Sequence, residues 1–372
     1  MKPPSAGDRQ PVNGSFMQIG IIGLPLSGKT TIFNALTRAG RPTGVGGAGK
    51  LEVFTAAVNV PDLRVDALSK LFNPRKTIYA QVRYTDISGS EREISAQGFS
   101  GQLLNTLATM DALALVLRAF DDDAVPHPDG SVDPERDLRK LESEFILTDL
   151  VTVERRLEKL EEGIKKGARD RDLLQRELPL FEQMKAALEE ERPVRELDFT
   201  DEQARGLRGY GLITLKPALI IVNEGETPWA KPIRSPHKRT DVVTMKGKIE
   251  AELAELPADE AAAYLADFGI DEPGLVKAIR SSYKLLGLQS FFTVGEDEVR
   301  AWTVRAGATA LECAGAVHTD IMKGFIRAET VSYDDLIRLG SLAAARDKGR
   351  LRLEGKEYVA HDGDIMHFRH SG

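Results

Sequence analysis

Residues 23–30 read GLPLSGKT and match the pattern G-x-x-x-x-G-K-[ST], which requires a strand that turns tightly into a helix. The flanks fit this requirement: the apolar run at 18–22 is typical of a buried strand, and apolar residues recur at helical spacing over 31–36. The backbone N–H groups of such a turn point into one concavity, where the positive end of the helix dipole also favours anions. The sequence therefore predicts a strand–loop–helix unit that binds the phosphates of a nucleoside triphosphate.

The side chains of this loop have separate expected tasks. Gly23 and Gly28 let the backbone approach the ligand without Cβ clashes, and Lys29 reaches the β- and γ-phosphates. The Thr30 hydroxyl is placed to ligate Mg²⁺. We therefore expect ATP or GTP and Mg²⁺ here, with Lys29 and Thr30 contributing to catalysis. The expected nucleotide-binding residues of the loop are Pro25, Leu26, Ser27, Gly28, Lys29, Thr30 and Thr31.

A second element of the nucleotide site is expected at 84–89, which reads YTDISG. An aspartate at the carboxyl end of a core strand lies beside the phosphate loop, so Asp86 can hold Mg²⁺ directly or through water. Gly89 can then offer its N–H to a γ-phosphate, as in switch-type NTPases. The D-x-x-G pattern predicts Asp86 and Gly89 as catalytic residues, and Asp86 as a metal ligand beside Thr30.

The element that reads the base should follow a later strand, and NEGE at 223–226 stands there. Guanine-specific switches carry N-K-x-D at this point, whereas here Glu226 replaces the aspartate and Glu224 the lysine. The amide of Asn223 can pair with N7 and N6 of adenine. The expected base-binding residues are Asn223, Glu224, Gly225 and Glu226. Adenine is favoured, guanine stays open, and a solvated acidic turn is the alternative.

The pattern of the chain predicts an α/β fold with a mostly parallel sheet. Strands are expected at 53–60, 81–86, 112–118, 217–223 and 241–245. The expected divisions are a disordered leader at 1–16, a discontinuous P-loop domain at 17–133 and 214–285, a helical hairpin inserted at 134–213, and a small α+β module at 286–372. In that module we expect strands at 291–294, 325–330, 351–353 and 357–359 and a helix at 309–316.

The inserted hairpin is predicted from apolar residues at three- and four-residue steps over 138–164 and 174–188, between many charged ones. Gly163 and Gly167 mark the turn between the two helices. Two arrangements fit this pattern equally well. The hairpin can project as an arm, or its helices can pack back on the body.

Composition limits the classes of protein that the chain can belong to. It has 372 residues, enough for two or three domains with sizeable cores. Cys313 is the single cysteine, so the chain has no internal disulfide or cysteine-based zinc site and suits a reducing cytoplasm. No apolar run is long enough to span a membrane. The formal net charge of −7 argues against extensive nucleic-acid binding, and we expect no DNA partner.

Several longer strings are more specific than the loop itself. They are DISG at 86–89, N-x-x-E at 223–226, DEPGL at 271–275, LGLQSFFT at 286–293, EVRAWT at 298–303, HTDIMKGFIRAE at 318–329, LEGK at 353–356 and DGDIMHF at 362–368. On these strings, and on GLP at the start of the loop, the chain resembles the YchF-type ATPases, a branch of the Obg-related GTPases. The resemblance implies a G domain interrupted by a helical arm and followed by a ubiquitin-like TGS domain. It also implies a preference for ATP over GTP and association with ribosomes or ribosomal RNA.

The chain departs from this family where catalysis is concerned. Leu26 stands where the family has an Asn that can help ligate a monovalent cation, so we expect no potassium activation. KLEVF at 50–54 lacks the expected switch-I threonine, and the charged SEREI at 90–94 replaces a glycine-rich switch II. Lys50 and Arg92 are candidate internal cations. Because positioning and electrostatics supply nearly all of phosphoryl-transfer catalysis, we expect intact phosphate binding but slow hydrolysis.

The C-terminal module carries a candidate RNA-binding face formed by Arg300, Lys323 and Arg327, with Phe325 and Trp302 among them. TGS domains of related translation factors contact RNA. On composition alone, it is equally consistent that the aromatic residues belong to the core and the cations to an ordinary surface. The sequence thus supports an ATP-preferring, ribosome-associated switch with weak hydrolysis, and as the alternative a non-catalytic nucleotide-binding adaptor for RNA or protein.

Overall fold

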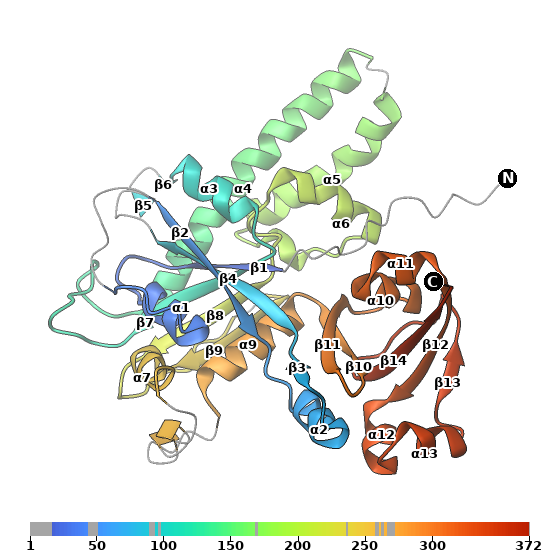
Figure 1. Ribbon diagram of the computed structural model, residues 1–372. Helices are drawn as coiled ribbons and strands as arrows, with labels where there is room; N and C mark the ends of the chain where they lie inside the picture. The colour runs from blue at the N-terminus through green and yellow to red at the C-terminus, as the bar shows by residue number, and fades with distance from the viewer. Residues whose placement is uncertain are drawn as a thin grey trace. The chain divides into compact units, whose positions relative to one another are not determined.

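The computed structural model describes residues 17–43, 51–88, 94–95, 98–167, 170–235, 237–256, 260–261, 264–265 and 272–371. Contacts divide the chain into two compact units. Unit 1 contains Ala57–Val82 and Leu286–Gly372, and unit 2 contains Gln18–Ala56 and Arg83–Leu285. Figure 1 shows the elements of each. Among the described residues, none of the helices has the length and apolar character needed to span a membrane.

Unit 2 is built on a six-stranded sheet with the order β2-β4-β1-β7-β8-β9. The strands are β1 (Gln18–Ile22), β2 (Glu52–Asn59), β4 (Gln81–Ser88), β7 (Ala112–Ala119), β8 (Ala218–Glu224) and β9 (Thr240–Met245). The pairs β1–β4, β1–β7, β7–β8 and β8–β9 are parallel. Every residue of β7 is buried, as expected for a parallel strand that helices cover on both faces. The predicted α/β fold with a mostly parallel sheet is confirmed.

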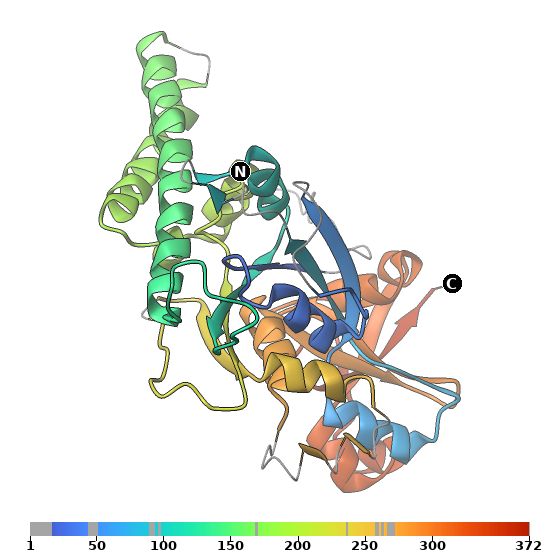
Figure 2. The ribbon, with the colours of Figure 1, turned by 90° about the vertical axis from the view of Figure 1, so that its left-hand side faces the viewer.

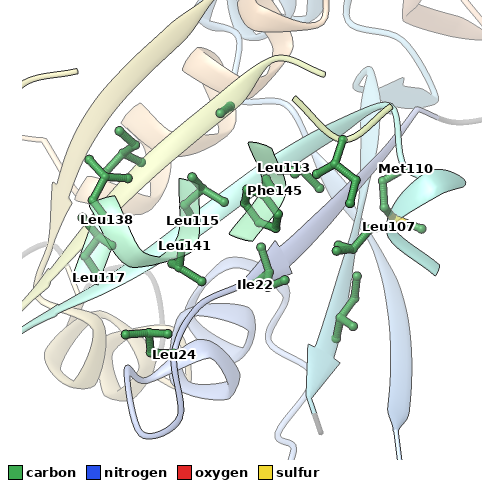
Figure 3. Packing of buried hydrophobic residues seen from close by; sticks show 14 of the residues in the cluster. Ile22, Leu24, Leu107, Met110, Leu113, Leu115, Leu117, Leu138, Leu141 and Phe145 are labelled. Atoms are coloured by element: carbon green, nitrogen blue, oxygen red, sulfur yellow. The ribbon is translucent and has the colours of Figure 1, made fainter. Parts of the chain in front are cut away.

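Helices cover both faces of this sheet (Figure 2). The helices of unit 2 are α1 (Lys29–Thr37), α3 (Gly101–Ala108), α4 (Pro134–Lys165), α5 (Arg171–Glu189), α6 (Asp201–Leu207), α7 (Gly247–Leu253) and α9 (Gly274–Leu285), of which α5 and α6 belong to the inserted segment. Two short strands, β5 (Ile94–Ser95) and β6 (Gly98–Phe99), pair outside the main sheet. Figure 3 shows the core against α4, where Leu138, Leu141 and Phe145 meet Leu115 and Leu117 of β7. This core fixes the strand ends that carry the candidate site.

Helices α4 and α5 form the predicted antiparallel hairpin. The first turns of α4 pack on the sheet, and the rest packs on α5. The second cluster contains Ile146, Val153, Leu157 and Leu160 of α4 with Phe181, Met184 and Leu188 of α5. Gly167 supplies a left-handed residue (φ 67°) at the turn, whereas Gly163 lies inside α4. Both ribbon views show the far end of the hairpin extending away from the sheet, so of the two arrangements the structure has the projecting arm.

Unit 1 contains a second six-stranded sheet, with the order β13-β12-β14-β10-β11-β3. Its strands are β3 (Lys76–Ile78), β10 (Leu288–Val294), β11 (Glu298–Arg305), β12 (Phe325–Ser332), β13 (Arg352–Glu354) and β14 (Asp364–His370). Its helices are α2 (Leu63–Phe72), α10 (Ala310–Val317), α11 (Thr319–Lys323), α12 (Tyr333–Leu339) and α13 (Leu342–Asp347). The unit is therefore α+β, with antiparallel pairs β10–β11 and β12–β14 and a parallel pair β10–β14.

Two sequence predictions differ from the structure in unit 1. The predicted strand at 357–359 is wrong, because Tyr358 N–H closes a turn onto Gly355 O and Val359 makes only an isolated bridge to Thr309. The segment Ala57–Val82 was expected in the P-loop domain, but contacts group it with the C-terminal region, where β3 pairs in parallel with β11. A three-residue strand such as β3 depends on its partner and has no periodic signal of its own.

The base of the hairpin is fixed to the segment before β8 by Asp149. Its carboxylate, which is 1% exposed, accepts hydrogen bonds from Ile213 N (2.9 Å), Thr214 N (2.7 Å) and Thr214 Oγ1 (2.6 Å). Burial raises the pKa of Asp149 to about 6. The buried Asp149 carboxylate on α4 thus binds two main-chain N–H groups of the segment that returns from the insertion to the sheet.

We expect Asp149→Ala to lower the free energy of unfolding by about 2–4 kcal/mol, because two buried N–H groups would lose their acceptor. Urea titration followed by circular dichroism would measure the change. Glu161→Ala, which removes an exposed carboxylate from the same helix, is the matched control. A loss for Asp149→Ala no larger than that of the control would contradict the structural role of this carboxylate.

Candidate functional site

The two glycines of the loop between β1 and α1 lie close against neighbouring strands. Gly28 has φ 90°, and a Cβ there would lie 2.2 Å from Asn223 Nδ2. A Cβ at Gly23 would lie 2.4 Å from Val116 O. Both glycines are therefore required by the neighbouring strands β8 and β7. Leu26 also has positive φ (61°), which costs a non-glycine residue about 1 kcal/mol.

Lys29 points its ammonium group back across this loop. Nζ donates to Gly23 O and to Leu24 O, each at 3.0 Å. Burial lowers the pKa of Lys29 to about 8, and the negative charge of Asp86 opposes this shift. A phosphate anion bound in the loop would favour the charged form of the lysine.

Thr30 and Asp86 are brought together as predicted. The Thr30 hydroxyl donates to Asp86 Oδ2 at 3.1 Å, and the Asp86 side chain is fully buried at the carboxyl end of β4. A hydroxyl and a carboxylate are the hard oxygen ligands that Mg²⁺ prefers, with waters and phosphates completing its shell. Within the ranges that the structure describes, no group of three or more His, Cys, Asp or Glu side chains could hold a metal alone. These two residues therefore fit a magnesium ion that arrives with a nucleotide.

Arg41 contacts the same carboxylate and was missed by the sequence analysis. Its guanidinium donates to Asp86 Oδ2 through Nη1 and to Glu52 Oε2 through Nη2, the latter at 3.0 Å. Arg41 lies four residues beyond α1, in a segment without strand or helix periodicity. Only its place after the phosphate loop, where a first switch begins, could have drawn attention to it.

Asn223 joins the end of β8 to the phosphate loop. Its side chain, in a residue that is 3% exposed, donates through Nδ2 to Ser27 O (3.0 Å) and accepts through Oδ1 from Gly247 N (3.1 Å). Among the described residues the buried amide thus donates once and accepts once. Glu224 Oε1 instead accepts from Trp229 N (2.9 Å) and closes a turn, Gly225 lies against Phe120, and Glu226 is exposed.

The three cations predicted to bind RNA lie on three different elements of unit 1, Lys323 on α11. Arg300 is on β11 and Arg327 on β12, with two strands between them, which corresponds to about 14 Å. Arg300 stacks on Trp302 at 3.9 Å, and Lys323 lies 3.9 Å from an Asp320 carboxylate oxygen. Trp302 and Phe325 are only partly buried and pack against the core. Arg300 thus lies against an aromatic ring, whereas Lys323 lies near a carboxylate.

Three residues named from the sequence lie outside the described residues. They are Gly89, expected to contact the γ-phosphate, and Lys50 and Arg92, the candidate internal cations. Of the remaining loop residues, Pro25, Leu26 and Thr31 are half-buried, and Ser27 is buried. Taken together, Ser27, Gly28, Lys29, Thr30, Asp86 and Asn223 form one site at the carboxyl ends of β1, β4 and β8, as parallel sheets require.

A parallel sheet whose first strand turns through this glycine-bordered loop into a helix defines the fold of a P-loop NTPase. A family model for the C-terminal region of YchF GTPases, described as "Protein of unknown function (DUF933)", matches residues 288–371. "Ribosome-binding ATPase YchF" of Bacillus subtilis (strain 168) is 40% identical over 361 residues, covering 94% of this chain and 98% of the relative. "Obg-like ATPase 1" of Oryza sativa subsp. japonica is 35% identical over 382 residues, covering 99% and 96%.

A solved structure gives the same result. That of the Schizosaccharomyces pombe YchF GTPase has a TM-score of 0.81 and 29% identity and covers 96% of this chain and 98% of that one. The chain belongs to the YchF family, and the resemblance found in the sequence is confirmed.

We expect nucleotide affinity to fall as the pH rises above about 8, because free Lys29 then loses the proton that the phosphate-bound form retains. Binding of Mg-ATP should take up close to one proton at about pH 9 and little at about pH 7. Isothermal titration in buffers of different ionisation enthalpy measures this uptake. Lys29→Arg keeps a charged group at both pH values and should show none of it. Equal proton uptake at both pH values would contradict the lowered pKa.

Proposed function

We propose that this chain is a nucleotide-binding switch protein that prefers ATP, hydrolyses it slowly and associates with ribosomes in the cytoplasm. The observation that carries the proposal is the contact of Lys29, Thr30 and Asp86 around one phosphate loop. The printed name of several relatives, ribosome-binding ATPase, supports the partner. The absence of a membrane-crossing helix among the described residues is consistent with it.

In this proposal each residue acts through position and charge. The amides of the loop and the Lys29 ammonium bind the phosphates, while Thr30 and Asp86 would hold Mg²⁺. A bound magnesium ion would neutralise charge that develops between the phosphates. The Asn223 amide holds the loop against β8 and offers its remaining N–H to the base. Slow turnover follows from Leu26, which cannot ligate a monovalent cation.

The preference for adenine is tested by calorimetric titration with Mg-ATP and Mg-GTP. We expect ATP to bind more tightly, because Glu224 is engaged with Trp229 N and Glu226 does not reproduce the shorter Asp of the guanine-specific pattern. Lys29→Ala should abolish binding of both nucleotides. If GTP binds more than about tenfold tighter than ATP, a gap of ~1.4 kcal/mol, the interpretation of 223–226 is wrong.

The alternative is an adaptor that binds nucleotide without using its hydrolysis. The observation that favours it is the Arg41 guanidinium on Asp86, which occupies the carboxylate that catalysis needs. Co-sedimentation with ribosomes distinguishes the two functions. A switch should lose nucleotide-dependent association in Lys29→Ala, whereas an adaptor should associate equally well with and without this substitution.

We also propose that Arg300, Lys323 and Arg327 contribute separately to RNA contact. The two strands between Arg300 and Arg327 favour separate weak phosphate contacts over one concentrated patch. Each substitution to Ala should weaken ribosome co-sedimentation moderately and reduce its dependence on salt concentration. Arg338→Ala, which removes an exposed arginine from α12, is the control. Three variants that each behave like this control would refute the proposed surface.

A further inference from the structure

Arg41 places a guanidinium on the carboxylate that the proposed function assigns to magnesium. Its Nη1 donates to Asp86 Oδ2, the same oxygen that accepts the Thr30 hydroxyl. The Asp86 side chain is fully buried, and that of Arg41 is only 12% exposed. The ion pair therefore lies largely away from water, where salt screens charges least.

Contacts with Asn34, Phe54 and Glu52 hold Arg41 in this place. The Asn34 side chain on α1 binds its main chain at both ends, donating from Nδ2 to Arg41 O (2.7 Å) and accepting at Oδ1 from Arg41 N (2.9 Å). The Phe54 ring lies 3.5 Å from Cζ of the guanidinium. Glu52 Oε2 accepts from Nη2 at 3.0 Å. Ordering a long arginine side chain costs rotamer entropy. The contacts with Asn34, Phe54 and Glu52 offset this cost and keep the guanidinium beside Asp86.

A cation held by Thr30 and Asp86 would need the oxygen that Arg41 already uses. Arg41 and a divalent metal are therefore alternative partners of Asp86. Without either of them, a buried carboxylate would face the phosphates of a nucleotide, and like charges at short distance repel strongly in a poorly solvated site.

We propose that Arg41 is the resident cation of the phosphate site, which neutralises Asp86 when no metal is bound and competes with Mg²⁺ for this carboxylate. The inference rests on the proposed function, because it requires nucleotide binding at Lys29 and Thr30. A nucleotide without metal then binds beside an Asp86 whose charge Arg41 neutralises. A nucleotide that binds with Mg²⁺ must first break the Arg41–Asp86 ion pair. Arg41 therefore reduces the dependence of nucleotide affinity on magnesium.

The test compares the Kd of ADP in EDTA with its Kd in excess Mg²⁺, by isothermal titration of the full chain. In Arg41→Gln the ratio of metal-free to magnesium Kd should rise at least about tenfold over wild type. The rise should come from weaker metal-free binding, with magnesium-dependent binding equal or tighter. A ratio that stays within about twofold of wild type would overturn the proposal. A ratio that falls would also overturn it, because it would mean that Arg41 stabilises the magnesium-bound nucleotide more than the metal-free one.

Two further variants isolate the ion pair from other effects of the substitution. Arg38→Gln removes an exposed arginine of the same segment and should leave the ratio as in wild type. On an Asp86→Asn background, Arg41→Gln should change the ratio by less than about twofold, because the carboxylate that it neutralises is gone. A tenfold effect that persists there would show that Arg41 acts elsewhere and would overturn the assignment.

Folding and the proposed function are checked in the same series. If Arg41→Gln does not fold by circular dichroism, Arg41→Met keeps the alkyl stem against Phe54 and is judged by the same ratios. Wild-type protein that binds ADP in neither condition would refute the proposed function. Wild-type and variant proteins that both bind ADP with equal ratios would refute the role of Arg41 alone.

Discussion

Asn223 is the residue on which three segments of the nucleotide site depend. Its buried amide accepts from Gly247 N and donates to Ser27 O, so the ends of β8, the β9–α7 connection and the phosphate loop are held together by one side chain. Gly28 can approach it only because it has no Cβ. A neutral amide with both ends satisfied is inexpensive to bury, whereas a carboxylate or an alkyl group at this position would leave buried main-chain groups without partners. The shape of the phosphate loop is thus set by a strand about two hundred residues away.

The sheet that carries this site also determines where the hairpin can be inserted. The insertion leaves after β7 and returns before β8, and these two strands are parallel neighbours in the sheet. Parallel neighbours always need a long crossover connection, so a helical arm can take its place without disturbing the strand order. Asp149 accepts a hydrogen bond from Thr214 in the segment that leads back to β8. Leu138 and Phe145, in the first turns of α4, pack in the core of the sheet. The arm therefore rises from the strands that border the nucleotide site.

The features that the sequence predicted correctly are those with a strong local pattern. β7 and β8 are continuous apolar runs, the hairpin has apolar residues at helical steps, and GKT follows a buried strand. β11 and β14 carry charged residues between apolar ones, and the sequence analysis did not predict them as strands. β3 is a strand only because β11 lies beside it. Thr30 and Asp86 were predicted because a motif names them, but Arg41 belongs to no motif, and its contact depends on how the chain returns from α1 to β2.

The charges around the phosphate loop support the proposal that this chain binds nucleotide well but hydrolyses it slowly. Lys29 and Arg41 supply two positive charges, and Asp86 and Glu52 supply two negative ones. Among the residues that the structure describes, these four charges sum to zero before any ligand arrives. The Lys29 ammonium donates to main-chain oxygens of the loop, and burial lowers its pKa. A nucleotide that brings its own anionic charge favours the charged form of Lys29 and is attracted to it directly. In the proposed function hydrolysis gains less, because the Arg41 guanidinium is bound to the Asp86 carboxylate. A stable resting charge balance therefore favours retention of nucleotide over rapid turnover.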